Sequence, residues 1–199
     1  TRIYTPEDYG LLGIFNSLVT VFVVMSTWGY HLGIMLPKKN KDAANMLGIS
    51  ISGSFMTAVV LLFIFSLFNQ QTAELTGNSK ISIWLYFVPL IVFFRGSYES
   101  LTVWLNRNKK YKSIASTKVI TRIVSSVGQV GGGFAQMGSV GLIGSVILGA
   151  STGTFILFRG ALIGFKNIFK ELSAIKMRYL YKRYKKFPLF SMPSALLNS

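Results

Sequence analysis

Five long apolar stretches leave few folds open to this chain. They cover residues 9–36, 43–68, 81–105, 114–136 and 142–165. A helix of roughly 20 apolar residues crosses a hydrocarbon core of about 30 Å. A transmembrane β-strand would instead show about 10 residues of alternating polarity, which none of these stretches does. Because helices satisfy their own backbone groups inside lipid, the sequence predicts an all-α integral membrane protein, a helical bundle of five transmembrane helices.

The first of these helices has a recognisable start. In "YTPEDYG", Thr5 suits the N-cap, Pro6 the first helical position and Asp8 an acidic variant of the capping box. Acidic side chains in the first turn also stabilise the helix, because they lie at the positive end of the helix dipole.

The composition favours the same class. Hydrophobic residues make up 51% of the chain and charged residues 14%, with a mean hydropathy of +0.48. A soluble domain carries about 25% charged residues. The absence of cysteine and the single histidine exclude disulfides, thiolate metal sites and a histidine metal cluster. We therefore expect no metal site and no cofactor.

Basic residues lie on alternate connections between the predicted helices. Loops 37–42 and 106–113 and the segment 166–190 are rich in lysine and arginine, whereas the opposite side has Arg2 and Lys80. The positive-inside rule places the basic side in the cytoplasm. The helix of residues 9–36 then begins at the outer face, so we expect a missing helix upstream, six in all.

The segment 166–190 follows the first bundle, residues 1–165, as a basic linker. It is expected to lie on the anionic lipids of the inner leaflet, because apolar residues recur at helical spacing among its cations. That stripe consists of Phe165, Ile168, Phe169, Leu172, Ile175 and Tyr179. A solvated linker is the alternative, and no nucleic acid is expected despite the net charge of +15. Residues 191–199 are expected to begin a second bundle, cut short.

Glycine is frequent in the fourth and fifth predicted helices. Pairs four residues apart are Gly128 and Gly132, Gly149 and Gly153, and Gly160 and Gly164. This spacing lets helices approach closely, and a hinge is the alternative. No phosphate loop is expected, because no lysine follows the glycines as that motif requires.

Charged residues inside the predicted helices are the main indication of function. They are Arg95, Glu99, Lys118, Arg122 and Arg159. Counted from the helix ends at about 1.5 Å per residue, Arg95 lies level with Arg122, and Glu99 beside Lys118. Cations in excess of acids inside a membrane indicate a wet cavity for an anionic substrate. Arginine suits phosphate, because its planar fork binds two oxygens at once. Structural ion pairs are the alternative.

No catalytic residues can be assigned. Glu99 is the single carboxylate within a predicted span, and no nucleophile, base and orienting group come together. His31 lies near the cytoplasmic end of the first span, as a hydrogen-bonded interface residue or, alternatively, a residue that couples transport to protons.

Three stretches of sequence carry a resemblance to a known family. They are "TRIYTPEDYGLLGIFNSLVTVF", "GIMLPKKNKDAANML" and "RYKKFPLFSMPSALLNS". The chain resembles the Wzx-type O-antigen flippases, polysaccharide transporters of the multidrug/oligosaccharidyl-lipid/polysaccharide exporter superfamily. The resemblance implies about twelve helices in two bundles around a central cavity, of which this chain would be one half. It departs from the family at "WGYHLGIMLP", where Tyr30 and His31 replace the charged residues often found there.

The resemblance also implies a function. An undecaprenyl-diphosphate-linked oligosaccharide, such as an O-antigen repeat unit, would move across the bacterial inner membrane by alternating access. No covalent change is involved, so the protein would not be an enzyme. Other polysaccharide assembly proteins would be its partners. We expect Arg95 and Arg122 to clamp the diphosphate, supported by Arg159 and Lys118. Glu99 and His31 would act as charge partners or in ion coupling.

Two other functions remain open at this point. A drug or small-solute exporter of the same superfamily would prefer acidic residues in its cavity. A membrane-embedded polysaccharide polymerase or acyltransferase would need a large outer loop or a cluster of histidine and acids. The outer loop "NQQTAELTGNS" is short.

Overall fold

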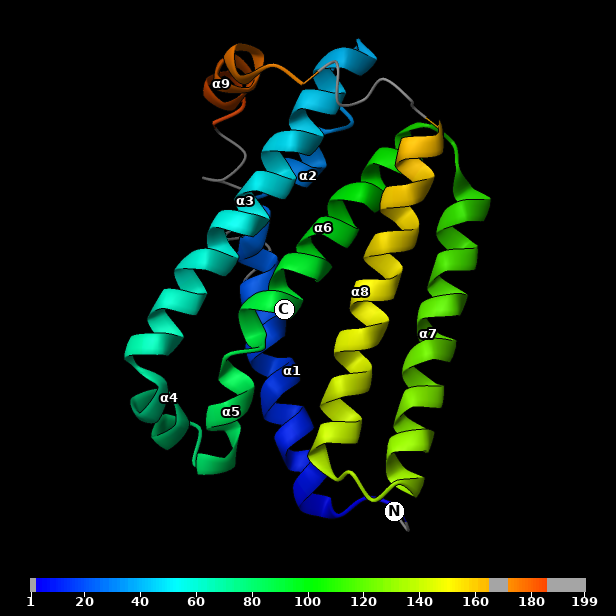
Figure 1. Cartoon of the computed structure of the whole chain (residues 1–199). Coiled ribbons are helices and arrows are strands. Elements are labelled where there is room, and N and C mark those ends of the chain that lie inside the picture. Colours follow the sequence, from blue (N-terminus) through cyan, green and yellow to red (C-terminus); the bar gives the residue numbers. More distant parts are fainter. Residues whose placement is uncertain (1–2, 165–171, 186–199) are drawn as a thin grey trace.

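The computed structural model describes residues 3–164 and 172–185, and all regular structure within them is helical (Figure 1). The elements in chain order are α1 (Pro6–Ser26), α2 (Tyr30–Gly33), α3 (Asn40–Leu67), α4 (Asn69–Leu75), the 3-10 helix η1 (Ser79–Ile81), α5 (Ser82–Leu85), α6 (Val88–Arg107), α7 (Tyr111–Phe134), α8 (Ser139–Gly164) and α9 (Ala174–Arg183). The expected all-α class is confirmed. The expected second-bundle residues, 191–199, lie outside the described residues.

The start of α1 follows the sequence prediction. The Oγ1 atom of Thr5 accepts from the backbone N–H of Asp8 at 3.2 Å, and the Asp8 carboxylate accepts from the backbone N–H of Thr5 at 3.0 Å. Pro6 occupies the first turn. Each partner satisfies a backbone donor that the helix leaves unpaired, so this capping box fixes where α1 begins.

Three helices are long and apolar enough to cross a membrane, namely α1, α3 and α8. Ser79–Leu85 and α6 are bent by 52° relative to each other, and they make a fourth span if the two pieces are counted as one. The chain is therefore a multi-pass membrane protein. The single straight helix expected over residues 81–105 is divided at this bend. Pro89 lies in the first turn of α6, where its missing N–H costs no helical hydrogen bond.

Helix α7 is as long as a span but is not apolar enough to count as one by composition among the described helices. The helix predicted over residues 114–136 is therefore present as α7, with a less apolar composition than α1, α3 and α8. Figure 1 shows α7 running alongside α8 over most of its length. The polar residues that lower its hydropathy belong to one face, whose surroundings are described below.

The stretch predicted as one helix over residues 9–36 is also divided. Helix α1 ends at Ser26, and α2 begins at Tyr30 after a turn that holds Gly29 at φ 70°. The Nε1 atom of Trp28 donates to Oγ1 of Thr57 in α3 at 3.0 Å. Arg107 at the end of α6 donates to the carbonyl oxygens of Met35 at 3.0 Å and Pro37 at 2.6 Å. These bonds hold the segment after α2 against α6.

The basic connections lie at one end of the bundle. The turn between α6 and α7, the segment before α3, and α9 are at the upper end in Figure 1. The N-terminal end of α1 and the turn between α7 and α8 lie at the opposite end. The connections that are rich in lysine and arginine therefore lie together at one end of the bundle, and the other connections lie at the opposite end.

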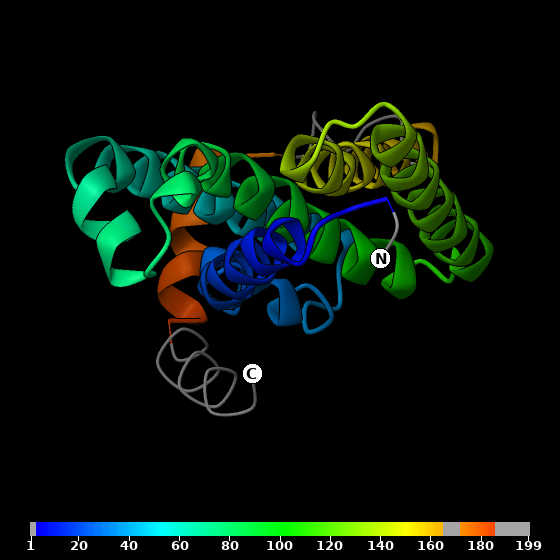
Figure 2. The ribbon, with the colours of Figure 1, turned by 90° about the horizontal axis from the view of Figure 1, so that it is seen from below.

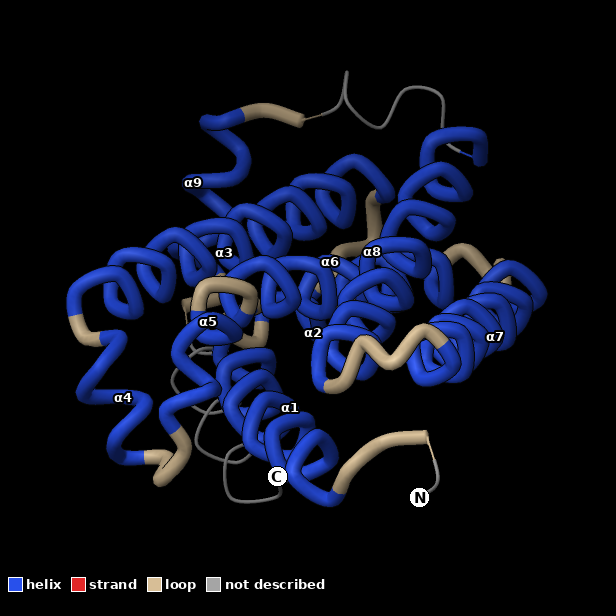
Figure 3. Tube along the Cα trace, turned by 60° about the horizontal axis from the view of Figure 1, so that its bottom comes forward, coloured by secondary structure: helices blue, strands red, loops and turns tan. Residues whose placement is uncertain are grey.

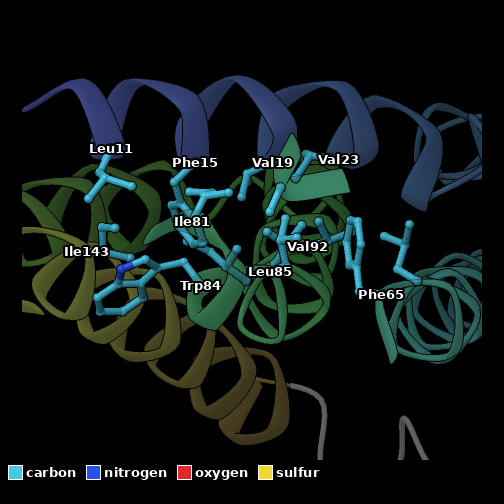
Figure 4. Packing of buried hydrophobic residues seen from close by; sticks show 14 residues of the cluster. Leu11, Phe15, Val19, Val23, Phe65, Ile81, Trp84, Leu85, Val92 and Ile143 are labelled. Atoms are coloured by element: carbon cyan, nitrogen blue, oxygen red, sulfur yellow. The ribbon is translucent and has the colours of Figure 1, made fainter. Parts of the chain in front are cut away.

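Two apolar clusters hold the helices together. In the first, Leu11, Phe15, Val19 and Val23 form one stripe of α1 that packs against η1, α5, α6 and α8 (Figure 4). In the second, Trp104 of α6 is buried with Met46 of α3 and Leu157 of α8. The clusters lie toward the two ends of α6, which contributes to both and is the central helix of the bundle (Figure 2).

Helices α7 and α8 approach each other through glycine. A Cβ atom at Gly132 would lie 2.7 Å from the Cα atom of Gly141, and one at Gly128 would lie 2.7 Å from Cβ of Ser145. Gly149 and Gly153 face Ser125 and Thr121 in the same way. Close packing was the expected role of these four glycines, and it is confirmed. Gly160 adds a looser contact with Ser113.

Helix α9 lies across α3 rather than along it (Figures 1 and 2). The rings of Tyr30 and Tyr181 stack at 5.5 Å, and Leu180 is buried. The backbone N–H of Ser173 donates to Oδ1 of Asn45 at 2.9 Å. These contacts come from a face of α9 other than the predicted apolar stripe, whose contact with the inner leaflet stays a prediction. Ile175 and Tyr179 are exposed, and the docking face lies on the other side of the helix; Phe165, Ile168 and Phe169 lie outside the described residues.

Candidate functional site

A cavity of about 720 Å³ lies between α1, α6, α7 and α8. Its lining consists of Leu12, Asn16, Arg95, Tyr98, Glu99, Lys118, Thr121, Arg122, Ser125, Gln129, Val146 and Ala150. Most of the polar side chains come from α6 and α7, whereas α8 supplies small apolar residues. A cavity of this size can hold a sizeable polar group, because binding sites for small molecules are typically about 300–1,000 Å³.

Helix α7 turns one polar face toward this cavity. Lys118, Thr121, Arg122, Ser125 and Gln129 recur at spacings of three and four residues, so they form one stripe. The opposite face carries exposed Val119, Ile123, Val127 and Val130. The helix is therefore amphipathic, with an apolar face suited to lipid and a polar face suited to water. This division explains why the mean hydropathy of α7 is lower than that of α1, α3 and α8.

Helix α6 brings three further side chains to the cavity. Arg95, Tyr98 and Glu99 share one face, since they are three and four residues apart. Arg95 of α6 and Arg122 of α7 line the same cavity, as expected of two residues on neighbouring helices. Their level placement stays a prediction.

The cations of the cavity are not neutralised by the protein. Among the described residues, no ion pair of 4 Å or less joins Glu99 to Arg95, Lys118, Arg122 or Arg159. An ion pair does occur elsewhere in the described chain: Nζ of Lys80 lies 2.8 Å from the carboxylate of Glu7 at the surface. The expected pairing of Glu99 with Lys118 or Arg159 is therefore absent. Three cationic side chains and one acidic side chain line the cavity, which leaves an excess of positive charge.

Two of the predicted site residues lie elsewhere. Nδ1 of His31 is hydrogen-bonded to Oγ1 of Thr27 at 2.6 Å, and the histidine does not line the cavity. Arg159 is exposed on α8 and is also absent from the lining. The histidine is thus hydrogen-bonded, as the first of its two descriptions expected. Arg159 misses the cavity because it lies on a different face of α8 from Val146 and Ala150.

Sequence reasoning missed the neutral polar residues of the cavity. Asn16 of α1 was not singled out, and neither were Ser125 and Gln129 of α7. The spacing of the polar residues along α7 was the available signal, since it marks one helical face. For Asn16 no comparable signal exists, because it is surrounded in sequence by apolar residues of α1.

The N-terminal segment covers one end of the cavity. The hydroxyl of Tyr4 donates to the backbone carbonyl of Gln129, a residue of the lining. Burial raises the pKa of Tyr4, so its hydroxyl remains a donor at neutral pH. The carboxylate of Asp8 lies next to the turn between α7 and α8, since a Cβ atom at Gly138 would be 3.2 Å from its Oδ1 atom. Figure 3 shows the segment before α1 running next to the turn between α7 and α8.

The described residues contain no group of three or more His, Cys, Asp or Glu side chains that could hold a metal ion. The chemistry that the cavity offers is therefore electrostatic and hydrogen-bonding. Its arginines and lysine can bind an anion, and its amides and hydroxyls can bind a neutral polar group.

The comparison with known proteins gives one match. The family model described as polysaccharide biosynthesis protein matches residues 1–170. Neither a curated protein nor a solved structure matches the chain. The matched region includes every residue that lines the cavity. With a multi-pass helical fold and a match over most of its length, this chain belongs to the polysaccharide biosynthesis protein family.

Proposed function

We propose that this protein is a flippase of the Wzx type, within the multidrug/oligosaccharidyl-lipid/polysaccharide exporter superfamily. Its substrate would be an undecaprenyl-diphosphate-linked oligosaccharide, the repeat unit of O-antigen or another surface polysaccharide. The observation that carries the proposal is the unneutralised positive charge of the cavity. A cation without a partner inside a membrane is costly, so such charge is expected where an anionic ligand compensates it.

Arg95, Arg122 and Lys118 are proposed to bind the diphosphate. Both guanidinium groups line the same cavity, and a diphosphate between them would make an attractive contact with each. Lys118 lies one turn from Arg122 on the same face of α7 and adds a third cation. Arg159 is left out of this clamp, because it does not line the cavity. Glu99 adjusts the local charge and is the cavity residue best suited to ion coupling.

Transport in this proposal involves no covalent step. The oligosaccharide cannot cross hydrocarbon unaided, so the polar face of α7 would replace water around it. The lipid tail would stay in the bilayer. Alternating access would then expose the cavity to each side of the bacterial inner membrane in turn. The basic end of the bundle would face the cytoplasm, in keeping with the positive-inside rule.

A second surface is proposed to contact lipid. Helix α9 carries Lys176, Arg178, Lys182 and Arg183 beside the exposed Ile175 and Tyr179. A helix that combines cations with exposed apolar side chains suits the anionic headgroup region of the inner leaflet. Its position across α3, at the basic end of the bundle, supports this placement.

The cavity disfavours the alternative functions. A drug exporter for cationic compounds would need an excess of acidic groups, whereas this lining has the opposite charge. A polymerase or acyltransferase would need a nucleophile with a base near it. Glu99 is the one carboxylate and no histidine is present among the lining residues.

The test is a complementation assay with the double variant Arg95→Gln, Arg122→Gln. One charge contact at about 4 Å is worth on the order of 4 kcal/mol at an effective dielectric of 20, before desolvation is subtracted. Loss of both is therefore expected to lower surface polysaccharide at least tenfold. Arg95→Lys should rescue only in part, because an ammonium lacks the two-pronged geometry.

The matched control is Lys112→Gln, which removes one cation from α7 outside the cavity lining. It should leave surface polysaccharide unchanged. Membrane levels of each variant are measured by immunoblot in parallel. Wild-type levels of surface polysaccharide in the double variant would refute the clamp.

A further inference from the structure

The polar side chains of the cavity are divided along its length. The charged ones, Arg95, Glu99, Lys118 and Arg122, lie toward the basic end of the bundle. Of the neutral ones, Tyr98 and Thr121 lie among the charged residues, whereas Asn16, Ser125 and Gln129 lie toward the end where Tyr4 bonds to Gln129. On α7 the order is Lys118, Arg122, Ser125, Gln129, and the last is about 10 Å beyond Arg122 at 1.5 Å per residue.

The two amides are available for a ligand. Within the described residues, the side-chain amides of Asn16 and Gln129 make no hydrogen bond, although both residues are half-buried. Other partly buried asparagines behave differently. Nδ2 of Asn69 donates to the carbonyl of Ser82 at 2.9 Å, and Nδ2 of Asn108 donates to the carbonyl of Trp104 at 2.8 Å.

An amide held in a cavity without a partner is suited to a neutral ligand rich in hydroxyl groups. Each carboxamide offers an acceptor oxygen and two N–H donors, which match the alternating donors and acceptors of a sugar. Phosphate would be a poorer occupant of this half than of the charged half, because the donors here are neutral and charge-assisted hydrogen bonds are the stronger ones. A cationic ligand is disfavoured by Arg122, one turn away from Ser125.

We propose that Asn16, Ser125 and Gln129 form a sugar subsite, which binds the sugar attached directly to the diphosphate. This inference rests on the proposed function, since the clamp at Arg95 and Arg122 sets where the diphosphate lies. The sugar would then point toward Tyr4 and the diphosphate toward the basic end. The subsite makes the protein sensitive to the identity of this first sugar, whereas the clamp is common to every lipid diphosphate.

The experiment compares two probes on the full-length protein in nanodiscs. One is undecaprenyl diphosphate, and the other is the undecaprenyl-diphosphate-linked oligosaccharide extracted from the cells that make this protein. Binding is measured by native mass spectrometry. Asn16→Ala and Gln129→Ala should each weaken binding of the oligosaccharide probe about fivefold, the effect of one lost neutral hydrogen bond. Binding of undecaprenyl diphosphate should be unchanged, which also shows that the variants are folded.

The controls separate the subsite from the clamp. Ser17→Ala and Ser126→Ala replace neighbouring polar residues outside the lining and should bind both probes like the wild type. Arg95→Gln with Arg122→Gln should weaken both probes alike. If the Asn16 and Gln129 variants bind the oligosaccharide probe like the wild type, or lose both probes equally, the subsite is refuted while the clamp stands. If the arginine double variant retains both probes, the proposed function itself fails.

Discussion

The hydroxyl of Tyr4 donates a hydrogen bond to the backbone carbonyl of Gln129, 125 residues further along the chain. The same hydroxyl lies next to Gly132 and Gly141, where an added Cβ atom would be 3.2 Å and 2.8 Å from it. The bond joins the segment before α1 to the helix that lines the cavity with its polar face. We expect this bond to hold the segment before α1 against that end of the cavity.

The first prediction concerns this contact. Tyr4→Phe removes one hydrogen bond, worth about 1 kcal/mol, so the open population of this end should rise about fivefold. Since the chain has no cysteine, Ser125→Cys provides a single label inside the cavity. Its rate of reaction with a membrane-impermeant thiol reagent, applied from the side of the N-terminal end of α1, should rise by the same factor.

The control for this measurement is Tyr86→Phe, which changes an exposed tyrosine at the same end of the bundle. It should leave the labelling rate unchanged. An equal rate in the Tyr4→Phe and wild-type backgrounds would show that this contact does not close the cavity.

The sequence was sufficient for the helices whose surroundings are uniform. Helices α3 and α8 begin and end within three residues of the predicted stretches, because an apolar helix surrounded by lipid and apolar neighbours shows its length directly in its hydropathy. The start of α1 was predicted as well, since a capping box is a local interaction of adjacent residues.

Features that depend on tertiary contacts could not be predicted from the sequence alone. The break between α5 and α6 places Ile81 and Leu85 under α1, and only the packed structure shows this burial. Similarly, Asn16 becomes a cavity residue because α1 packs beside α6 and α8. The charged residues were found because ionic side chains are rare in apolar helices, whereas a single neutral amide is not.

The second prediction concerns whether α7 crosses the membrane. Its polar stripe faces the cavity and its apolar face is exposed, so α7 should span despite its low hydropathy. Lys110 and Met137 flank the helix and should then lie on opposite sides of the membrane. In intact cells, a membrane-impermeant thiol reagent should label Met137→Cys and leave Lys110→Cys unlabelled until the cells are opened.

Asn78→Cys serves as the reference for the outer side, because the loop that holds it lies at the same end as Met137. Labelling of both Lys110→Cys and Met137→Cys from outside would mean that α7 does not cross, and the cavity would not be a transmembrane passage.

The third prediction concerns α9 and lipid. Two faces of this helix are distinct, since Leu180 and Tyr181 pack on the bundle while Ile175 and Tyr179 are exposed. Each Lys or Arg near an anionic surface contributes about 1 kcal/mol. Amide hydrogen exchange of residues 174–183 should therefore slow when nanodiscs of phosphatidylcholine are replaced by nanodiscs that contain phosphatidylglycerol, and 1 M salt should weaken this protection.

Replacement of Lys176, Arg178, Lys182 and Arg183 by Gln should abolish the difference between the two lipids. The matched control removes cations at the same end of the bundle but outside α9, with Lys109, Lys110 and Lys112 changed to Gln. This control should keep the lipid-dependent protection of α9, because the helix retains its own cations next to its exposed apolar side chains. Protection that is equal in neutral and anionic nanodiscs would mean that packing on α3, through Tyr181 and Leu180, holds α9 without lipid.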